Sequence, residues 1–508
     1  MEHILSLNWL VFSPLIAFGL ILSPLFGDNE VIIRRFSKGF ACLHFFYTIL
    51  FLAVFDPSTY GMSFGTELKI ADVSWLNVLG ISASFAVDGL SLLLVVLSSF
   101  IFLLAFVASK SSIRTKHKFY YSMMFLLQCA VLGVFCAKDM FLFFLFWELE
   151  LIPMYFLISE WGSGDCKKSA MKFILYTFLG SMVMLIGMLT LYFYSFAVSN
   201  TLTSNIEMLS IAEPIYPIWF QRAVFFAFLI GFAIKIPIIP FHTWLPDAHS
   251  DAPTPVSMIL AAILLKMGVY GVIRYNVCIF PEIFKWFAPA LMIFAVINIV
   301  WAACCAIVQK DLKRIVAFSS ISHMGIVLLG LAALNQVGLD GAMYQMLSHG
   351  LISAGLFMIV GIIYNRCKTR DLTSINGLGE VMPNLLVLSL PIILACAGVP
   401  LLAGFPGELM SFVASFSAEF ENMVLPKVLS IIGVGGLILC AAYCLRILHS
   451  VYFSPITEQY SNIKDIRGHQ LVILFILAIA IIMFGLFPGA ILDIINPLSS
   501  VIIDILKV

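Results

Sequence analysis

Residues 231–249 read GFAIKIPIIPFHTWLPDAH, and this stretch places a charge beside a break in a helix. Lys235 lies inside an apolar run, and Pro237 and Pro240 follow it closely. Because proline has no N–H, the carbonyl of Ala233 loses the donor that a continuous helix would supply. In lipid such a carbonyl needs another partner, usually water or a polar side chain in a cavity lined by protein. We therefore expect a broken, hydrated helix beside a buried lysine.

The composition is that of a membrane protein. Of the 508 residues, 62% are hydrophobic and 11% are charged, and the mean hydropathy is +1.06, whereas a soluble domain is about one quarter charged. The 28 basic and 28 acidic residues leave no net charge, and no basic block predicts a nucleic-acid partner. The 11 cysteines are scattered without a C-x-x-C pair, which predicts small core residues. Cys440 and Cys444 share a helix face, but two thiols without partners do not make a metal site.

Apolar runs long enough to cross a bilayer fill nearly the whole chain. We therefore expect an all-α polytopic membrane protein with about fourteen transmembrane helices. The expected spans are 8–26, 37–55, 85–108, 119–137, 140–159, 171–196, 219–246, 255–275, 286–308, 315–335, 341–364, 385–418, 427–449 and 469–492.

Basic residues predict the orientation of these spans. Most Lys and Arg residues fall in loops that follow odd-numbered spans, as in the runs Arg34–Arg35 and Lys313–Arg314. Because basic loops stay on the side of synthesis, we expect the odd-numbered loops to be cytoplasmic, or matrix or stromal in an organelle. Both termini then lie on the opposite side.

Several ionisable residues lie inside the expected spans. Each costs roughly 2.5–3.5 kcal/mol at the bilayer centre on insertion scales, so each indicates a function or a partner. Lys235 and Lys266 are candidates for proton transfer, with a fixed ion pair as the structural alternative for each. Glu148 and Glu150 are two positions apart, about 200° around a helix, so we expect only one of them to face a given partner.

Two histidines and a glutamate extend this set into the second half of the chain. His323 and His349 lie in consecutive spans, each roughly 12 Å deep, so both approach the midplane of a core about 30 Å thick. Histidine relays protons near neutral pH, and simple hydrogen bonding in place is the alternative. Glu408 closes a second apolar stretch interrupted by proline and glycine. A broken span with a charge in each half is typical of internally repeated transporters.

Asp247 and His249 lie at the mouth of the first broken span. They fit either a proton entrance or a capping turn, and we prefer the turn.

Several motifs together resemble one family. DMFLFFLFWELELIPMYFLI, KFILYTFLGS, IKIPIIPFHTWLPDAHSDAPTPVSMILAAILLKMGVYGVIRY, DLKRIVAFSSISHMG and QMLSHGLISAGLF are similar to the chain M family, or subunit 4, of proton-pumping NADH:quinone oxidoreductase, respiratory complex I. AGFPGE departs from the asparagine-containing bacterial pattern before the terminal glutamate. WELELIP resembles the cyanobacterial and plastid NAD(P)H dehydrogenase branch, whose donor is ferredoxin and whose quinone is plastoquinone.

The resemblance implies an antiporter-like subunit with two inverted five-helix repeats. The implied divisions are helices 1–3 at 1–118, a first repeat at 119–275, a second repeat at 286–449 and a last helix at 469–508. Matched residue by residue, the implied catalytic residues are the acid–lysine pair Glu148 and Lys235, the central Lys266, the connecting His323 and His349, and the terminal Glu408. Glu150 is expected to face another channel, another subunit or a polar rim.

The same resemblance implies that this chain holds no redox centre. FMN, iron–sulfur clusters and quinone belong to other subunits of the complex, and the expected partners are the sibling chains L and N, the lipid bilayer and protons. The expected location is an energy-coupling membrane: the bacterial inner membrane, the mitochondrial inner membrane or the thylakoid. A multisubunit Na⁺/H⁺ antiporter subunit is the alternative function, and a scaffold with static ion pairs is a third.

Overall fold

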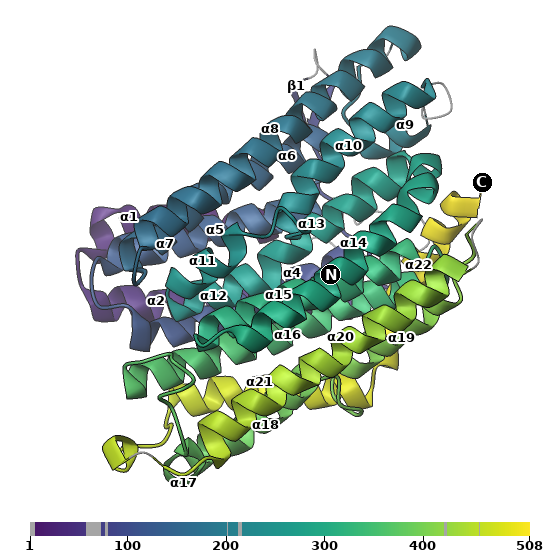
Figure 1. Ribbon diagram of the computed structural model, residues 1–508. Helices are drawn as coiled ribbons and strands as arrows, with labels where there is room; N and C mark the ends of the chain where they lie inside the picture. The colour runs from purple at the N-terminus through teal and green to yellow at the C-terminus, as the bar shows by residue number, and fades with distance from the viewer. Residues whose placement is uncertain are drawn as a thin grey trace.

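The computed structural model describes residues 6–56, 73–76, 80–200, 202–211, 216–420, 424–456 and 458–507. In these ranges the chain is almost entirely helical, as expected, and long helices run side by side (Figure 1). The first elements are α1 (Leu7–Leu22), η1 (Pro24–Phe26), α2 (Glu30–Val54), β1 (Val73–Leu76), β2 (Ile81–Ala83), α4 (Gly89–Ser112), α5 (His117–Cys136), α6 (Met140–Leu149), α7 (Leu151–Trp161), α8 (Cys166–Ser199), α9 (Ile206–Ile211), α10 (Ile218–Lys235) and α11 (Trp244–Asp251). The strands β1 and β2 pair antiparallel.

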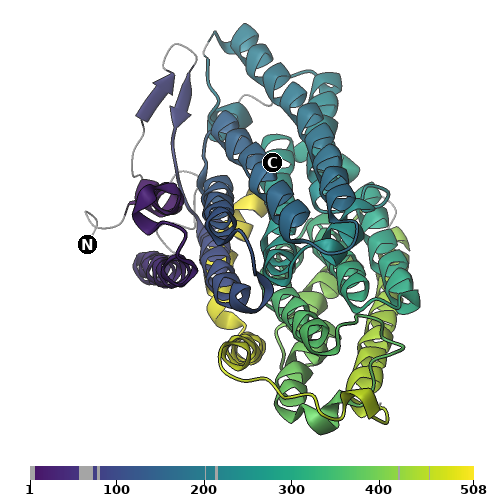
Figure 2. The ribbon, with the colours of Figure 1, turned by 90° about the vertical axis from the view of Figure 1, so that its left-hand side faces the viewer.

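The remaining elements complete the bundle. They are α12 (Thr254–Ile259), η4 (Leu260–Leu264), α13 (Leu265–Gly271), η5 (Val272–Val277), α14 (Pro281–Val308), α15 (Leu312–Ala332), α16 (Gln336–Cys367), α17 (Leu378–Val381), α18 (Pro383–Cys396), α19 (Gly404–Phe416), α20 (Val424–Leu448), η6 (His449–Phe453), η7 (Glu458–Tyr460), α21 (His469–Leu486) and α22 (Gly489–Lys507). The segments η4, η5 and η6 are π-helical. Figure 1 shows α8 and α10 along one edge of the molecule and α18 and α20 along the opposite edge. Figure 2 shows α1 and α2, in purple, at one side near the two strands.

Asx side chains fix where several of the long helices begin. Asp88 accepts from the backbone N–H of Ser91 at 2.9 Å, and the Ser91 hydroxyl bonds back to the Asp88 backbone, which completes a capping box. Asp139 and Asp311 each accept from backbone N–H groups in the first turns of α6 and α15. These acceptors satisfy N–H groups that have no partner within the helix.

Three spans lie wholly inside the bundle. The apolar windows of Thr254–Val277, Leu312–Ala332 and Gln336–Cys367 are completely buried, whereas only about a third or less of those in α2 and α21 is buried. These three inner spans carry Lys266, His323 and His349. The fold therefore places the predicted polar residues in its centre and its exposed apolar side chains on outer helices such as α8 and α20.

The described part of the chain has 13 helices long and apolar enough to cross a membrane. With the shorter α1 and the broken α18–α19 element they cover every expected span, and they add α22. The single last helix expected at 469–508 is wrong: it is divided into α21 and α22, because Pro488 between them has no N–H to continue the helix. The buried side chains of α22, among them Ile495 and Ile502, recur at helical spacing along one face.

Candidate functional site

Lys235 is the last residue of α10, and its side chain is buried. It forms an ion pair with Glu150, which is fully buried at the junction of α6 and α7. The Lys235 Nζ also lies 4.8 Å from the ring centroid of Trp147. Trp147 and Glu150 are three residues apart and so share a helix face. The direct partner of Lys235 is thus the second glutamate.

This contact corrects the expectation that Glu150 faces away from Lys235. The angular argument, that only one of the two glutamates faces a given partner, agrees with this contact, because the backbone of Glu150 keeps helical dihedral angles. The choice of Glu148 came from the resemblance, and the residue that meets Lys235 is Glu150. Glu148 is only half-buried; its charge still acts on Lys235, Ser181 lies beside it, and one of its oxygens has no hydrogen-bond donor in the described structure. Two carboxylates therefore act on one lysine, at contact and at longer range.

The break after Lys235 is closed by protein donors. The carbonyl of Ala233, which we expected to require water or a polar side chain, accepts from the backbone N–H of Ile238 at 2.8 Å. The indole N–H of Trp244 donates to the carbonyl of Ile234 at 2.9 Å. At Ala233 the hydration argument is therefore wrong, because a wider backbone turn supplies the donor.

Asn298 on α14 completes this closure. Its Oδ1 accepts from the N–H of Ile239 at 2.9 Å, and its Nδ2 donates to the carbonyl of Pro237 at 3.3 Å. Sequence analysis missed this residue. A buried asparagine inside an apolar run is the signal that could have found it.

Lys266 lies on α13, between the π-helical segments η4 and η5. Its Nζ donates to the carbonyl of Ala261 at 2.7 Å and lies 2.7 Å from Nδ1 of His349. A π-turn alters the usual pairing of carbonyls within the helix, and such segments are frequent at functional sites. Lys266 thus contacts one neutral acceptor, the carbonyl of Ala261, and one histidine, His349.

His349, His323 and Glu408 continue from Lys266. The two imidazole rings are stacked, with centroids 5.4 Å apart and planes inclined at 24°. His323 Nε2 lies 3.4 Å from Glu408 Oε1, and Nδ1 lies 2.7 Å from the carbonyl of Ser319. Glu408 is buried in the first turns of α19. Four of the six predicted residues thus form one continuous row, which we call the central row: Lys266, His349, His323 and Glu408.

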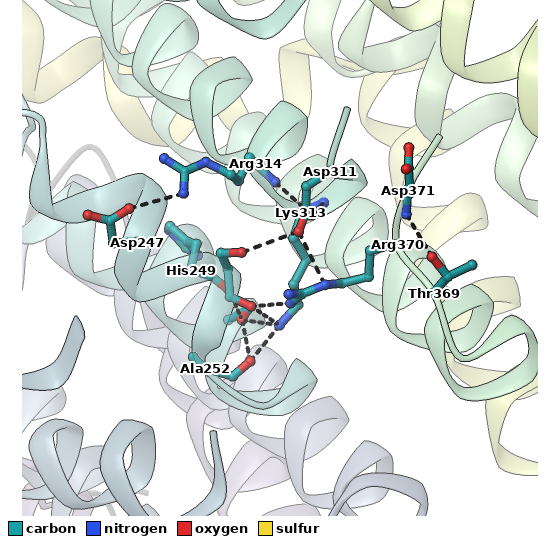
Figure 3. Close-up of polar contacts among 11 residues, drawn as sticks. Asp247, His249, Ala252, Asp311, Lys313, Arg314, Thr369, Arg370 and Asp371 are labelled. Atoms are coloured by element: carbon teal, nitrogen blue, oxygen red, sulfur yellow. Dashed lines mark hydrogen bonds and ion pairs between the residues drawn. The ribbon is translucent and has the colours of Figure 1, made fainter. Parts of the chain in front are cut away.

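A cluster of charges lies at one end of the bundle, around the C-terminus of α11 (Figure 3). Asp247 pairs with Lys172 at 2.7 Å and with Arg314 at 3.2 Å. Lys313 and Arg370 both donate to the carbonyl of Ser250. The expected capping role is therefore wrong for Asp247: it bridges helices, while basic side chains from other segments satisfy the end of α11.

His249 belongs to this end of the molecule but is buried. Its ring stacks on Phe357 with centroids 4.6 Å apart, and neither ring nitrogen has a hydrogen-bond partner in the described structure. The charges of Lys313 and Lys266 both act on it. His249 therefore lies between the charged cluster and the central row, and the capping expectation is wrong for it also.

Comparison with known proteins agrees with this architecture. The family model described as "NADH:quinone oxidoreductase/Mrp antiporter, TM" matches residues 137–433. An NAD(P)H-quinone oxidoreductase chain 4 from Synechococcus sp. (strain JA-3-3Ab) is 38% identical over 461 residues, which cover 90% of this chain and 84% of the relative.

Solved structures give the same result. A chain of respiratory complex I from Thermus thermophilus has a TM-score of 0.85 and 25% identity, over 99% of this chain and 100% of that chain. A chain of the Mrp complex from Dietzia sp. DQ12-45-1b has a TM-score of 0.84 at 20% identity, over 98% of this chain and 97% of that chain. The second likeness shows a shared fold.

The fold and the buried charges define an antiporter-like, multi-pass membrane subunit. The chain belongs to the NADH:quinone oxidoreductase/Mrp antiporter transmembrane family, within its quinone oxidoreductase chain 4 (chain M) branch. The resemblance seen in the motifs is confirmed. The chain is a membrane-arm subunit of a proton-translocating quinone oxidoreductase and works together with other membrane-arm subunits.

Proposed function

We propose that protons cross this chain along the central row, driven by quinone reduction in other subunits. The observation that carries the proposal is the continuity of the row, in which Lys266 contacts His349, His349 stacks on His323, and His323 meets Glu408. Amine, imidazole and carboxylate groups all bind and release protons. A scaffold with static ion pairs would not require two stacked histidines between a lysine and a glutamate.

In this proposal the ion pairing of Lys235 regulates proton transfer along the central row. Glu150 holds Lys235 in the state described here, and Glu148 is the second acid whose charge reaches it. Movement of the ammonium group from one carboxylate toward the other changes the electrostatic potential along the inner helices. In this mechanism Glu148 and Lys235 form the switching pair, and quinone reduction changes the balance between its two positions.

Protons enter, in this proposal, from the side of the charged cluster at α11. His249 lies between that cluster and Lys266, which makes it the connecting group. The odd-numbered loops are cytoplasmic, or matrix or stromal in an organelle, and both termini lie opposite. The ion pairs of Asp247 with Lys172 and of Arg370 with Asp311 support this topology, because they join loops that follow different odd-numbered spans.

The partners follow from the same assignment. Sibling chains L and N, lipid and protons are the proposed partners, and FMN, iron–sulfur clusters and quinone belong to other subunits. The membrane is the bacterial inner membrane, with the mitochondrial inner membrane and the thylakoid as alternatives. The likeness to the Synechococcus NAD(P)H-quinone oxidoreductase chain 4 supports NAD(P)H as the source of electrons, and ferredoxin is the alternative donor that the WELELIP motif suggests. The outward apolar faces of α8 and α20 offer surfaces to lipid and to neighbouring subunits.

The alternative function is a subunit of a multisubunit Na⁺/H⁺ antiporter. The likeness to the Mrp complex favours it only at the level of fold. Co-purification distinguishes the two functions, because a quinone oxidoreductase brings flavin-bearing and cluster-bearing subunits with it. An antiporter brings small membrane subunits without redox centres.

The first experiment replaces Lys235→Ala in sealed membrane vesicles. Quinone reduction by the native donor and the resulting pH gradient are recorded together, and assembly is checked on a native gel. We expect the complex to assemble and both activities to collapse. If both activities persist in the assembled variant, Lys235 is architectural and the proposed control is wrong.

Glu408→Gln tests the end of the central row. The amide keeps the size of the side chain but cannot accept and release a proton at neutral pH, so the pH gradient formed per quinone reduced should fall while assembly is retained. Glu419→Gln is the matched control, because Glu419 is exposed after the end of the same helix. Full pumping by Glu408→Gln would remove Glu408 from the path.

A further inference from the structure

Three potential metal ligands meet beside the last step of the central row. One ligand atom each from His323, Cys396 and Cys440 lies within 4.8 Å of the other two, and all three residues are buried. They come from α15, α18 and α20, which are distant in the sequence. The cysteines were expected to be simple core residues. The fold instead gives two of them a histidine partner.

The hydrogen bonds of His323 show which ring nitrogen is available. Nδ1 lies 2.7 Å from the carbonyl of Ser319, which can only accept, so Nδ1 carries a hydrogen. In neutral imidazole Nε2 then presents a lone pair. Nε2 faces the carbonyl of Cys396 at 3.2 Å and Glu408 Oε1 at 3.4 Å, which are acceptors in the ionised state. A position surrounded by acceptors favours a positive charge, either a proton or a metal cation.

The surrounding groups also fit metal binding. Cys440 Sγ donates to the carbonyl of Cys396 at 3.1 Å and lies 2.8 Å from the hydroxyl of Tyr443. Glu408 Oε1 is buried and has no hydrogen-bond partner in the described structure. A metal-binding histidine typically donates its other N–H to a carbonyl, as His323 does to Ser319.

We propose that His323, Cys396 and Cys440 bind a thiophilic divalent cation such as Zn²⁺, with Glu408 as fourth ligand, and that the bound ion stops proton transfer. In tetrahedral zinc sites the ligand atoms are roughly 3.5–3.8 Å apart, so the three cluster atoms, which lie within 4.8 Å of one another, must draw together by up to about 1 Å, and the Glu408 carboxylate, 3.4 Å from His323 Nε2, must turn toward the ion. Two thiolates offset the charge of the ion, which lowers the cost of placing it in an apolar interior, and the Glu408 carboxylate leaves the ligated site with one net negative charge.

The binding step is a ligand exchange without electron transfer. The two thiols lose their protons as the two metal–sulfur bonds form, and His323 Nε2 and Glu408 contribute lone pairs. The two thiols release two protons for each ion, and a protonated Glu408 releases a third, so binding weakens as the pH falls. The bound ion occupies the lone pair of His323 Nε2 and the carboxylate of Glu408, which are the groups that carry the proton in the last step of the proposed path. This inhibitory effect rests on the proposed function, whereas the binding site itself does not.

The first test counts bound zinc. The complex is dialysed against buffered low-micromolar free Zn²⁺, and metal per complex is measured for the wild type and for Cys440→Ser, Cys396→Ser and Cys129→Ser. Serine keeps a hydroxyl that can take over the hydrogen bonds, and Cys129 is a buried thiol on α5, outside the cluster. We expect the two cluster variants to lose one zinc relative to the wild type and to Cys129→Ser. Equal zinc in all four proteins would overturn the site.

The second test measures inhibition. Zn²⁺ is titrated into vesicles while the pH gradient and quinone reduction are recorded. The zinc concentration for half-inhibition should rise about tenfold or more in Cys440→Ser, because loss of even an outer partner of a ligand weakens metal binding by roughly 10–100-fold. Unchanged inhibition in Cys440→Ser overturns the inhibitory role. If the central row is not a proton path, Glu408→Gln will pump normally in the absence of zinc. The zinc count then still decides whether the binding site exists.

Discussion

The two broken helices, α10–α11 and α18–α19, use the same backbone closure. In the first, the N–H of Ile238 donates to the carbonyl of Ala233 at 2.8 Å; in the second, the N–H of Val399 donates to the carbonyl of Leu394 at 3.1 Å. Each bond spans five residues instead of four. The two halves thus end a helix in the same way, which supports the proposed division into repeats.

The breaks differ in what surrounds them. The first receives side-chain donors from Trp244 and Asn298. In the second, Gly398 and Leu401 adopt left-handed backbone conformations, and Glu408 Oε1 has no hydrogen-bond donor in the described structure. Neighbouring side chains therefore fix the first break in place. The second break leaves a buried carboxylate oxygen without a hydrogen-bond donor, as the proposed proton path requires.

The largest loss of stability is expected for replacement of Glu150, the acid that pairs with Lys235 at the first break. Glu150→Gln leaves the charge of Lys235 buried without its direct partner, and breaking a buried ion pair costs about 3–5 kcal/mol. Glu148→Gln leaves that pair intact. We therefore expect Glu150→Gln to reduce the amount of assembled complex on a native gel and its thermal stability. Glu148→Gln should assemble normally and lose pumping.

The reverse outcome would contradict this assignment of the two acids. If Glu148→Gln fails to assemble while Glu150→Gln is as stable as the wild type, Lys235 pairs with Glu148 in the complex. Glu160→Gln, at the end of α7 and paired with Lys116 at the surface, serves as the control for loss of an exposed charge.

The next largest effect is expected for a substitution at Gly398, in the second break. A Cβ added at Gly398 would lie 2.3 Å from Glu408 Oε2, and the φ of +71° is unfavourable for residues other than glycine. Gly398→Ala should displace the carboxylate and cause a several-fold fall in the pH gradient formed per quinone reduced. Gly435→Ala is the control, because nothing lies within 4 Å of its added Cβ. Equal pumping in both variants would show that the position of Glu408 is not critical.

A smaller effect is expected for the amide that closes the first break. Asn298→Ala leaves the N–H of Ile239 and the carbonyl of Pro237 without their side-chain partner, at a cost of about 1–3 kcal/mol. The thermal unfolding midpoint of the complex should fall. Ile297→Ala, on the partly exposed side of the same helix, is the comparison. A larger loss from Ile297→Ala would mean that lipid or subunit packing outweighs the closure.

The smallest effect on pumping is expected for Trp244→Phe. Phenylalanine keeps an aromatic ring at this fully buried position, but it removes part of the indole together with the N–H that donates to the carbonyl of Ile234. We expect a loss of about 1–3 kcal/mol in stability, from the lost hydrogen bond and the small cavity, with pumping retained, measured by thermal unfolding and the vesicle assay. Loss of pumping at full stability would assign Trp244 a direct part in transport.

The sequence predicted the helices and singled out the four residues of the central row, because ionisable residues inside apolar spans are a strong signal. It did not predict their contacts, in which His349 and not His323 lies next to Lys266. It could not predict that Lys235 contacts Glu150, because helical spacing shows that the two glutamates face different ways but does not show which of the two faces meets Lys235. Asn298 and Trp244 were missed for a related reason: their acceptors are carbonyls in a break whose path depends on tertiary packing. The cluster of Cys396 and Cys440 with a histidine forms only where three helices meet. The spacing of these residues along the chain does not predict that meeting.

The stacked rings of His323 and His349 limit how many positive charges these two histidines can hold at once. Two positive charges 5.4 Å apart repel each other by about 3 kcal/mol at an effective dielectric constant near 20. Double occupancy of the pair is therefore unfavourable, and on the proposed path one proton leaves toward Glu408 before the next arrives from Lys266. On that proposal the two histidines pass protons one at a time, and the number of protons delivered depends on how often the pair is emptied.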